Sequence, residues 1–414
     1  MDHELACQSC GSTMEPGGYP DGCPDCAEAG EAGRLEVVYD YPDAAVLERA
    51  STGPDSMWRY REFLPLLADE PVTLGEGRTP LVPATSPSIP DAVDLRLKNE
   101  TVNPTWSYKD RLNSLLVSNA VALGERHFAT ASTGNHGAST AAYAARAGAE
   151  ETIVLIPPDT EAPHRVQLRA YGATVAVTAY DARSRLLERL VDRGWYPTVS
   201  VAGPDVGLPY SYEAYKTIAF ELVEELDGPP SAVTVPIGAG DGLYGVWKGF
   251  RELHEMGVID SPPRMYGVQP AERPSVVRAL AAGSETVEPV SGPMPVTTST
   301  SGPTAGDHAL RAIRESGGDA YAIDRADVLA AIRTAGRDAV FVEPASALSL
   351  AGAERAWEDG AIDDDGTVVC LATGAGVKWP DHCGEAVDAA PEIDATLEAL
   401  ADELDVEPAA PEGR

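Results

Sequence analysis

Residues 127–148 read HFATASTGNHGASTAAYAARAG, and this order of residue types indicates the architecture of the chain. A short apolar run predicts a strand, the Gly/Asn turn after it bends the backbone, and the alanine-rich run predicts a helix. The same strand–turn–helix order recurs on both sides of this stretch. Strands that alternate with helices pair in parallel and are covered by the helices, so the sequence predicts an α/β fold.

The remaining periodic segments extend this pattern along most of the 414 residues. Two parallel-rich sheets fit this length better than one. Residues 284–306, rich in Pro, Ser and Thr, are predicted to form a long connecting loop near the active site. We expect strands within 94–100, 151–158, 173–179, 231–238, 264–270 and 366–376, and helices within 107–125, 162–172 and 243–257.

The charge of the chain is strongly acidic. It has 31 Lys and Arg residues against 65 Asp and Glu residues, a formal net charge of −34. Such a surface repels phosphate backbones and anionic headgroups, which argues against nucleic-acid and membrane partners. It suits a protein kept soluble at high salt, where counterions screen self-repulsion, and we favour a cytoplasmic protein of a halophile. An acidic interaction tail at 402–414 is the competing interpretation.

The chain shows no segment typical of export or membrane insertion. No apolar run approaches the roughly 18 to 20 residues that cross a bilayer. The N-terminal residues MDHELACQSCGS show neither a basic nor an apolar signal region. We therefore expect a reducing, cytoplasmic environment, in which cysteines are thiols or metal ligands before they are disulfides.

Four of the six cysteines form two C-x-x-C knuckles separated by a Gly/Pro-rich loop. Two residues between thiolates let both sulfurs turn onto one ion, and two such turns complete a tetrahedral site without an open position. This pattern predicts structural zinc; two disulfides are the alternative. The remaining cysteines, Cys370 and Cys383, are expected to be buried or incidental thiols. The expected zinc ligands are Cys7, Cys10, Cys23 and Cys26.

Three further segments suggest sites for anionic groups. TVPIGAGDGLYG, residues 234–245, is a strand that enters a glycine turn before a helix, where backbone N–H groups and the helix dipole favour an anion. The turn at Ser132–Asn135 is a second such nest, and Thr373 ends a strand before another glycine turn. One lysine, Lys109, lies at the predicted start of a helix. An aldehyde cofactor with a phosphate tail, as in pyridoxal phosphate, would use all of these features together with an amino-acid carboxylate.

Several ordered motifs resemble the threonine synthases, in the β-family (fold type II) of pyridoxal-phosphate enzymes. Cysteine knuckles like those at the N-terminus occur in some archaeal members. The motifs are NPTWSYKDR at 103–111, similar to the family's lysine motif NPTGSFKDR; STGNHGASTAAYAARAG at 132–148, similar to its asparagine loop; VPIGAGDGLYGVWKGFREL at 235–253, similar to its phosphate loop and following helix; FVEPASALSLAG at 341–352; and TGAGVKWPD at 373–381.

The resemblance implies roles for individual residues. Lys109 would be the Schiff-base lysine and the general base at Cα. Asn135 would bond the hydroxyl of the pyridine ring, and Thr373 would face the pyridine nitrogen, a partner that suits replacement at Cβ or Cγ. The cofactor phosphate would be surrounded by Gly238, Ala239, Gly240, Asp241 and Gly242. The substrate would be held by Ser132, Thr133, Gly134, His136 and Arg165, where His136 is alternatively a polar helix-start residue and Arg165 a solvated one.

The resemblance also implies a domain organisation. We expect zinc-ribbon-like knuckles at 1–34, a larger cofactor-binding domain at 35–100 and 205–385, a smaller mobile domain at 101–204, and an acidic tail at 386–414. The helix residues Trp247 and Phe250 are expected in the core. Glu343 either lines the cofactor pocket or packs at a helix start. A small amino-acid substrate is implied, and a homodimer is one option for the assembly.

Some positions depart from the threonine synthase pattern. Those enzymes carry a threonine after the "GN" and an asparagine at the end of the phosphate loop, where this chain has His136 and Gly242. Trp106 replaces a glycine of the lysine motif and is expected to narrow the pocket. A carboxylate at Asp241 would repel a phosphate, so we expect it to point away or to be screened by a cation.

The reaction expected from the resemblance is the conversion of O-phospho-L-homoserine and water to L-threonine and phosphate by β,γ-replacement. Serine/threonine dehydratases, whose loops read SAGNHA and GGGGL, and cysteate synthase-like enzymes are alternatives within the same chemistry. GDGLYG at 240–245 also matches the dinucleotide fingerprint GxGxxG, so an NAD-dependent oxidoreductase is an alternative of another class. A zinc-ribbon binding protein without catalysis is a further alternative, against which the intact Lys109 argues.

Overall fold

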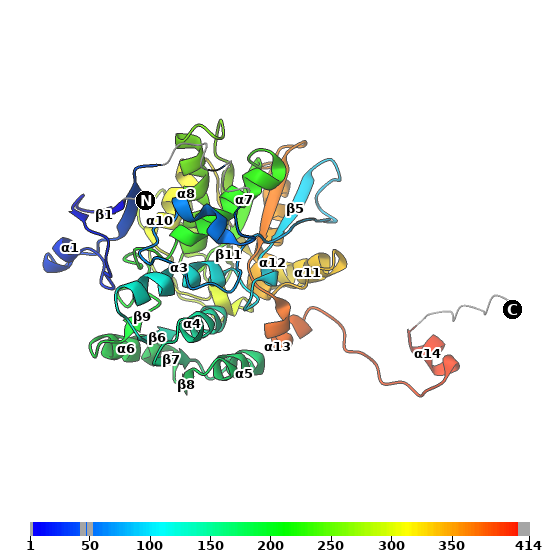
Figure 1. The fold of residues 1–414 in the computed structure, drawn as a ribbon. Helices are drawn as coiled ribbons and strands as arrows, with labels where there is room; N and C mark the ends of the chain where they lie inside the picture. Colours follow the sequence, from blue (N-terminus) through cyan, green and yellow to red (C-terminus); the bar gives the residue numbers. More distant parts are fainter. Residues whose placement is uncertain (1–2, 42–46, 48–52, 405–414) are drawn as a thin grey trace.

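Three β-sheets organise the chain. The computed structural model describes residues 3–41, 47 and 53–404 (Figure 1). Within this part, an N-terminal sheet has the strand order β2-β1-β3, a six-stranded sheet has the order β12-β11-β10-β13-β5-β4, and a four-stranded sheet has the order β8-β7-β6-β9. The two larger sheets confirm the predicted parallel-rich α/β architecture.

The six-stranded sheet is parallel except for its antiparallel β4–β5 edge. Its central strand β10 is buried along its whole length, as expected for a parallel strand covered on both faces. β5, β10, β11 and β13 start and end close to the predicted ranges, whereas β4 and β12 were not predicted. The sheet contains β4 (Leu81–Pro83), β5 (Asp94–Asn99), β10 (Ala232–Pro236), β11 (Arg264–Pro270), β12 (Ala320–Ile323) and β13 (Thr367–Ala372).

Helices cover both faces of this sheet, and alternate residues of each strand face opposite sides. Val233 and Val235 of β10 share one hydrophobic cluster with Trp247 and Phe250, which are buried in the core as predicted. Ala232 of the same strand belongs to the cluster of the other face. The first face carries α7 (Lys216–Leu226), α8 (Asp241–Glu255) and α10 (Asp307–Glu315), and the second carries α11 (Arg325–Arg337) and α12 (Pro344–Glu358).

The four-stranded sheet is entirely parallel and lies with its helices in the lower part of Figure 1. For example, Phe128 of β6 pairs with Thr152 of β7 on one side and with Tyr196 of β9 on the other. This unit contains β6 (His127–Ala131), β7 (Glu151–Ile156), β8 (Thr174–Val177) and β9 (Tyr196–Pro197), with α3 (Lys109–Ala122), α4 (Asn135–Arg146), α5 (Ala162–Ala170) and α6 (Tyr180–Val191).

The N-terminal sheet is antiparallel and packs against α8. Gln8 Nε2 donates to the Tyr244 hydroxyl at 3.1 Å, and Lys248 Nζ donates to the Val37 carbonyl at 2.8 Å. The cysteine knuckles therefore rest on the body of the protein. This module contains β1 (His3–Cys7), β2 (Thr13–Met14), β3 (Leu35–Tyr39) and the short helix α1 (Pro24–Glu28).

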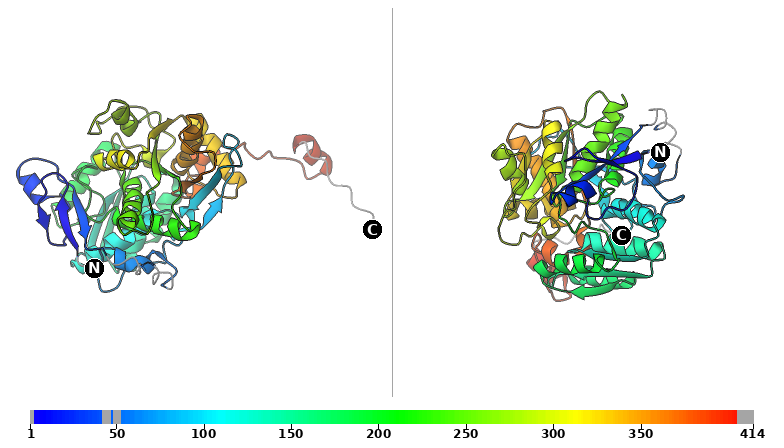
Figure 2. Two further views of the ribbon diagram at one scale, coloured as in Figure 1. Left: turned by 90° about the horizontal axis from the view of Figure 1, so that it is seen from above. Right: turned by 90° about the vertical axis from the view of Figure 1, so that its left-hand side faces the viewer.

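Short helices complete the described chain, and its end leaves the body. After α13 the chain runs outward to α14, as Figure 1 and the left-hand view of Figure 2 show. Residues 405–414, the end of the predicted acidic tail, lie outside the described part. The short helices are η1 (Met57–Phe63), η2 (Glu100–Val102), η3 (Glu213–Tyr215), α9 (Ser275–Ala281), η4 (Thr298–Thr300), η5 (Gly376–Lys378), α13 (Pro380–Gly384) and α14 (Leu397–Leu404).

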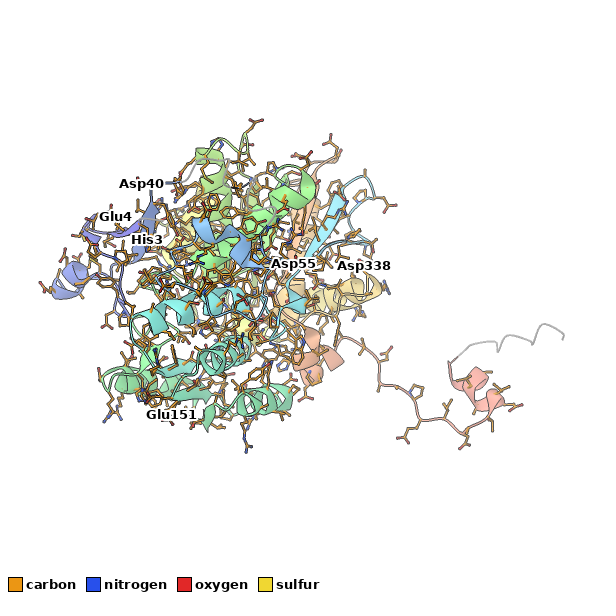
Figure 3. The ribbon with its side chains drawn as sticks, in the orientation of Figure 1. His3, Glu4, Asp40, Asp55, Glu151 and Asp338 are labelled. Carbon is orange, nitrogen blue, oxygen red and sulfur yellow. The ribbon has the colours of Figure 1, made fainter. Side chains whose placement is uncertain are left out.

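Acidic side chains lie on exposed positions in all parts of the fold. Glu4, Asp40, Asp55 and Glu151, labelled in Figure 3, are exposed and come from four different segments. In the described part of the chain, no helix combines the length and apolarity that a membrane span requires.

Candidate active site

The segment that carries Lys109 is attached to the carboxyl end of β13. The Tyr108 N–H donates to the Thr373 carbonyl at 2.9 Å, the Ala375 N–H donates to the Trp106 carbonyl at 3.0 Å, and Ser107 and Gly374 form a β-bridge. The helix α3 begins at Lys109, as predicted. Lys109 therefore lies at the carboxyl edge of a parallel sheet, where ligands bind in open α/β folds.

The residues around Lys109 in its motif close a tight turn. The buried Asp110 carboxylate accepts from both the backbone N–H and the hydroxyl of Thr105, each at 2.6 Å. Burial raises the pKa of Asp110 to about 6, although the Thr105 bonds act in the opposite direction. Trp106, inside this turn, has φ of +66° and is 45% exposed. This left-handed conformation is the physical reason why glycine suits that position.

Aromatic rings connect Lys109 with the glycine loop. Lys109 Nζ lies 4.7 Å from the centroid of the Tyr108 ring and 5.7 Å from that of Tyr215, and the two rings stack. A Cβ atom added at Gly242 would lie 2.8 Å from the Tyr108 ring. Lys109 and Gly242 thus flank the same tyrosine, and the two motifs meet in space.

The glycine loop ends β10 and opens α8, whose first residue is Asp241. Gly240 has φ of +106°, and a Cβ there would lie 2.7 Å from the Ala309 Cβ atom, so both conformation and space require glycine. The first turn of α8 leaves backbone N–H groups without intrahelical acceptors, which is the arrangement that binds phosphate.

The Asp241 carboxylate is paired, which answers the question that the sequence left open. Its Oδ1 atom lies 3.1 Å from Arg34 Nη2 and 3.2 Å from His308 Nε2. Burial alone would raise the pKa of Asp241, but His308 and Arg34 together hold it well below its usual range. Neither partner was expected from the sequence.

The Ser132–Asn135 turn opens α4 and is closed by its own serine. Ser132 Oγ accepts from the N–H groups of Gly134 and Gly137, at 3.1 and 2.9 Å. The hydroxyl proton of Ser132 therefore stays free to be donated to a carboxylate. Thr133 is half-buried beside it. The predicted turn lies at the start of a helix of twelve residues, and its role as an anion-binding nest stays a prediction.

Asn135, the last residue of this turn, contacts the start of α12. Its Nδ2 donates to Glu343 Oε2 at 2.6 Å, and Ser299 Oγ donates to Glu343 Oε1 at 3.1 Å. The Asn135 Oδ1 atom is buried and has no hydrogen-bond partner among the described residues. Burial raises the pKa of Glu343. Ser299 belongs to the long predicted loop, which reaches this group.

The end of β13 completes the group. The Thr373 and Ser346 hydroxyl oxygens lie 3.0 Å apart, and Ser346 Oγ also accepts from the Gly374 N–H at 2.7 Å. A Cβ atom at Gly374 would lie 3.0 Å from both Asn135 Nδ2 and the Glu343 carboxyl carbon. Thr373, Asn135 and Glu343 are thus brought together by three separate motifs.

His136 and Arg165 differ in their surroundings. His136 Nε2 lies 3.0 Å from Thr198 Oγ1, and burial together with nearby Lys109 lowers its pKa to about 3, so the ring is neutral at pH 7. Arg165 Nε donates to the Thr160 carbonyl at 2.7 Å, and its Nη2 donates to the Pro158 carbonyl. The guanidinium of Arg165 is engaged by its own loop, and a role in substrate binding stays a prediction.

One buried lysine near Asp110 and Glu343, Lys378, was not predicted as a site residue. Lys378 is 1% exposed, and its Nζ donates to the Thr105 carbonyl at 2.8 Å. Burial lowers its pKa to about 8, although the acids Glu343 and Asp110 act in the opposite direction. Its position in the TGAGVK stretch was the only available signal.

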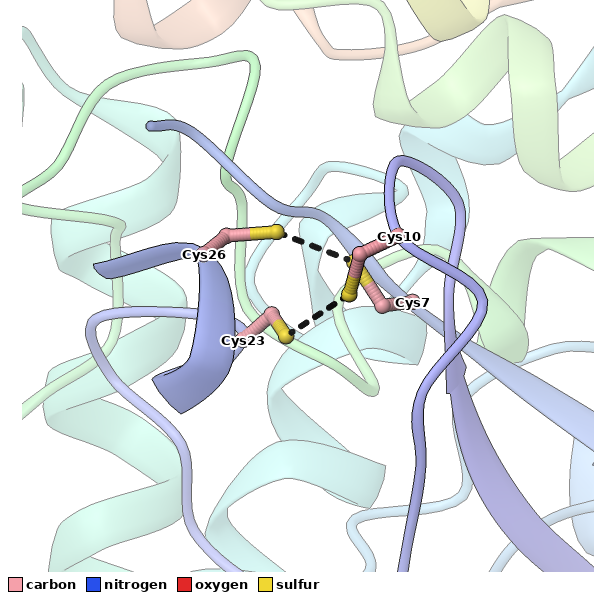
Figure 4. A group of neighbouring side chains, drawn as sticks. All are labelled: Cys7, Cys10, Cys23 and Cys26. Carbon is pink, nitrogen blue, oxygen red and sulfur yellow. Dashed lines mark hydrogen bonds between the residues drawn. The ribbon is translucent and has the colours of Figure 1, made fainter. Parts of the chain in front are cut away.

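The four N-terminal cysteines form one cluster, shown in Figure 4. The Cys7–Cys26 and Cys10–Cys23 sulfur distances are 3.6 and 3.7 Å, and all four sulfurs lie within 4.8 Å of one another. Zn–S bonds of about 2.3 Å in a tetrahedron place sulfurs about 3.8 Å apart, so the cluster has the dimensions of a tetrathiolate site. All six thiols are free, and Cys370 and Cys383 are buried as predicted.

The residues present fit pyridoxal phosphate. Lys109 can supply the amine that holds the aldehyde, and the first turn of α8 can supply phosphate-binding N–H groups. The unbonded Asn135 Oδ1 needs a partner, since a buried polar atom without one is costly. A bound pyridoxal phosphate would provide partners for Lys109, for the N–H groups at the start of α8 and for Asn135 Oδ1.

Comparison with known proteins agrees with this geometry. The family described as "Pyridoxal-phosphate dependent enzyme" matches residues 72–374. The threonine synthase of Methanosarcina acetivorans is 34% identical over 411 residues, 96% of this chain and 98% of that protein. The threonine synthase of Methanocaldococcus jannaschii is 34% identical over 95% of this chain and 97% of that protein, and that of Mycobacterium tuberculosis is 38% identical over 79% and 89%.

Solved structures share the fold at lower sequence identity. The processed form of threonine deaminase isoform 2 from Solanum lycopersicum superposes with a TM-score of 0.60 at 21% identity, covering 75% of this chain and 89% of that one. An O-ureido-L-serine synthase gives 0.61 at 19% identity, covering 76% and 95%. These likenesses concern the fold alone.

Proposed function

Because this chain belongs to the pyridoxal-phosphate-dependent enzymes and, within them, to the threonine synthases, we propose that it converts O-phospho-L-homoserine and water to L-threonine and phosphate. The observation that carries the proposal is the convergence of Lys109, the glycine loop and Asn135 at the carboxyl edge of the larger parallel sheet. The alternative of an NAD-dependent oxidoreductase, suggested by GDGLYG, gives no role to Lys109 beside the glycine loop.

The cofactor, when bound, supplies an electron sink for the substrate's Cα–H bond. In this proposal Lys109 holds it and afterwards moves protons at the substrate carbons. The glycine loop with the start of α8 binds the phosphate, Asn135 bonds the ring hydroxyl and Thr373 faces the ring nitrogen. Ser132, Thr133 and Gly134 bind the substrate carboxylate, supported by the free Ser132 hydroxyl proton and by the N–H groups at the start of α4.

His136 is proposed to orient the substrate rather than to carry charge. Its neutral ring bonds Thr198 and lies near Lys109, so it can exchange hydrogen bonds with a substrate phosphate without adding a fixed positive charge. Arg165 is the proposed source of that charge. It would have to leave the carbonyls of Thr160 and Pro158 to reach a substrate.

A dehydratase acting on serine or threonine is the second candidate. His136 and Gly242 favour it, because these positions lack the threonine and asparagine used by threonine synthases for the substrate phosphate. A cysteate synthase-like replacement would share the same cofactor site. The overall similarity to threonine synthases favours the first proposal.

We also propose structural zinc at Cys7, Cys10, Cys23 and Cys26, with residues 101–204 as the smaller mobile domain and 35–100 with 205–385 as the larger one. The dimensions of the sulfur cluster support the zinc.

The net charge of −34 supports a halophile's cytoplasmic protein, an origin in a haloarchaeon and stability that increases with salt. A homodimer is proposed for the assembly.

Phosphate release from O-phosphohomoserine at high salt, with threonine measured in the same samples, tests the function. Lys109→Ala should abolish both products and the visible absorbance of the lysine-bound cofactor. A matched control, Arg355→Gln, removes an exposed cation outside the site and should leave both products unchanged. Ammonia release from serine or threonine without turnover of phosphohomoserine would replace the first candidate by the second.

A further inference from the structure

An arginine of the N-terminal module reaches into the glycine loop. The Arg34 side chain is 4% exposed, and its Nη1 and Nη2 atoms lie 3.3 and 3.1 Å from Asp241 Oδ1. Its Nη2 also donates to the Pro204 carbonyl at 2.8 Å. Arg34 is far from Asp241 in the sequence, so the contact joins two separate parts of the molecule.

Asp241 creates an electrostatic problem for this loop. It is the first residue of α8, next to the N–H groups proposed to bind a phosphate dianion. An unpaired carboxylate there would oppose the phosphate, because like charges a few ångströms apart repel strongly outside bulk water. The positive Arg34 guanidinium, paired with Asp241, offsets this charge.

The second partner of Asp241 does not supply a compensating charge. His308 Nε2 lies 3.2 Å from Asp241 Oδ1, but burial, with Arg34 adding to its effect, lowers the pKa of His308 to about 4. Its ring is therefore neutral at pH 7. Among these contacts, Arg34 alone balances the carboxylate.

The two cysteine knuckles hold Arg34 in place through the backbone. The Cys23 N–H donates to the Gly33 carbonyl at 2.9 Å, and the Gln8 N–H donates to the Arg34 carbonyl at 2.9 Å. A Cβ atom at Gly33 would lie 2.7 Å from Cys26 Sγ. Gln8 follows Cys7 directly, so each knuckle contributes one bond to the segment that carries Arg34.

We propose that Arg34 is a positioning residue for the cofactor phosphate: it neutralises Asp241 in the phosphate loop and makes phosphate affinity depend on the folded cysteine module. The inference rests on the proposed cofactor site. It assigns the N-terminal module a role in cofactor retention in addition to any structural one. Arg34 acts through Asp241 and not by contact with the substrate.

Equilibrium binding of pyridoxal phosphate and of pyridoxal to the full-length cofactor-free protein separates the phosphate contribution from the rest of the site. Arg34→Gln should weaken pyridoxal phosphate binding by at least about tenfold, since an uncompensated charge remains beside the phosphate. Pyridoxal binding should change by less than about threefold, because it has no phosphate. Arg34→Lys, which keeps the charge, should recover most of the affinity.

A double-mutant cycle tests whether Arg34 works through Asp241. Asp241→Asn in the Arg34→Gln background should restore pyridoxal phosphate affinity to within about threefold of wild type. Arg355→Gln, a surface arginine paired with Asp359, is the matched control and should change neither affinity. Equal loss of pyridoxal and pyridoxal phosphate, or no rescue by Asp241→Asn, would overturn the inference.

The cysteine module is tested in the same assay. Cys10→Ser should lower the affinity for pyridoxal phosphate but not for pyridoxal, and its effect should not add to that of Arg34→Gln. Fully additive losses would refute the coupling. The readout is binding, so a wild-type protein that binds pyridoxal phosphate but does not turn over phosphohomoserine leaves this inference standing while the proposed function fails.

Discussion

Arg111 Nη1 lies 2.6 Å from Glu221 Oε1, and neither side chain is exposed to solvent. Arg111 also bonds Glu100, so the residue two positions after Lys109 is fixed between two buried carboxylates. Burial raises the pKa of Glu221, but Arg111 and Lys98 outweigh this and lower it well below its usual range. The ion pairs fix the first turn of α3, and with it the position of Lys109.

Glu221→Gln is expected to lower the free energy of unfolding by about 3 kcal/mol, because removing one partner leaves a buried charge with reduced compensation. Urea unfolding at constant salt measures this. Glu358→Gln, which removes an exposed acid paired with Arg355, should change stability by no more than about 0.5 kcal/mol. Similar small losses in both variants would show that the buried pair contributes little.

Asn135→Asp should place a second carboxylate against Glu343, where Asn135 Nδ2 now donates a 2.6 Å bond. Two buried carboxylates this close cannot both ionise, so one pKa rises above its unfolded value. Such a group lowers stability as pH rises. At pH 8 we expect Asn135→Asp to unfold about 2 kcal/mol more easily than Asn135→Ala, with the difference shrinking towards pH 5.

Urea unfolding of the cofactor-free variants at the two pH values measures this difference. Adding Glu343→Gln to Asn135→Asp is the control, and it should remove the pH-dependent part of the loss. A pH-independent deficit, or a deficit that grows towards pH 5, would contradict the assignment of the repulsion to Glu343.

Lys378 predicts a pH dependence of the opposite sign. Its native pKa is about 8 because of burial, against an ordinary value of 10.5 for lysine. Between these values the unfolded chain binds more protons than the native one, so stability rises with pH. The free energy of unfolding of wild type minus that of Lys378→Met should therefore rise by about 1.4 kcal/mol per pH unit from pH 8 upward, and it should stay constant below pH 7.

A second buried lysine provides the matched control. Burial acts to lower the pKa of Lys248, but Glu213, Glu36 and Glu252 outweigh it and raise the pKa. The stability difference between wild type and Lys248→Met should therefore stay constant between pH 7 and about 9.5. A constant difference for Lys378→Met over pH 8 to 10 would show that Lys378 is not the titrating group.

The sequence predicted many of the strands, helices and glycine turns, because these depend on local pattern, but it did not predict elements such as β12 (Ala320–Ile323) and α11 (Arg325–Arg337). The strand at Glu151–Ile156 contains the apolar run IVLI. The helix α4 directly follows the Gly/Asn turn after β6. The NPTWSYKDR motif indicated that α3 begins at Lys109. The antiparallel sheet of Leu35–Tyr39 with His3–Cys7 was not predicted, because the knuckles interrupt the strand pattern between them.

The contacts that tune the site could not be predicted from the sequence. Arg34 and Asp241 are separated by 207 positions, and nothing in the local pattern of either residue indicates the other. The pairing of Asn135 with Glu343 likewise depends on how the starts of α4 and α12 come together in space. Trp106 was recognised as a departure from glycine, but its left-handed conformation is seen only in the backbone.

Zinc in the cysteine cluster is the last prediction. The purified protein should contain about one zinc per chain, because four sulfurs within 4.8 Å of one another have the dimensions of a tetrathiolate site. Cys23→Ser should lose most of the metal and lower the free energy of unfolding, since metal binding is coupled to folding. The buried thiol variants Cys370→Ser and Cys383→Ser should retain the metal. Elemental analysis measures the content, and cobalt substitution reports the ligand set through its thiolate absorbance. If denatured, chelator-treated protein showed two reactive thiols instead of six, the knuckles would be disulfides and the zinc assignment would be wrong.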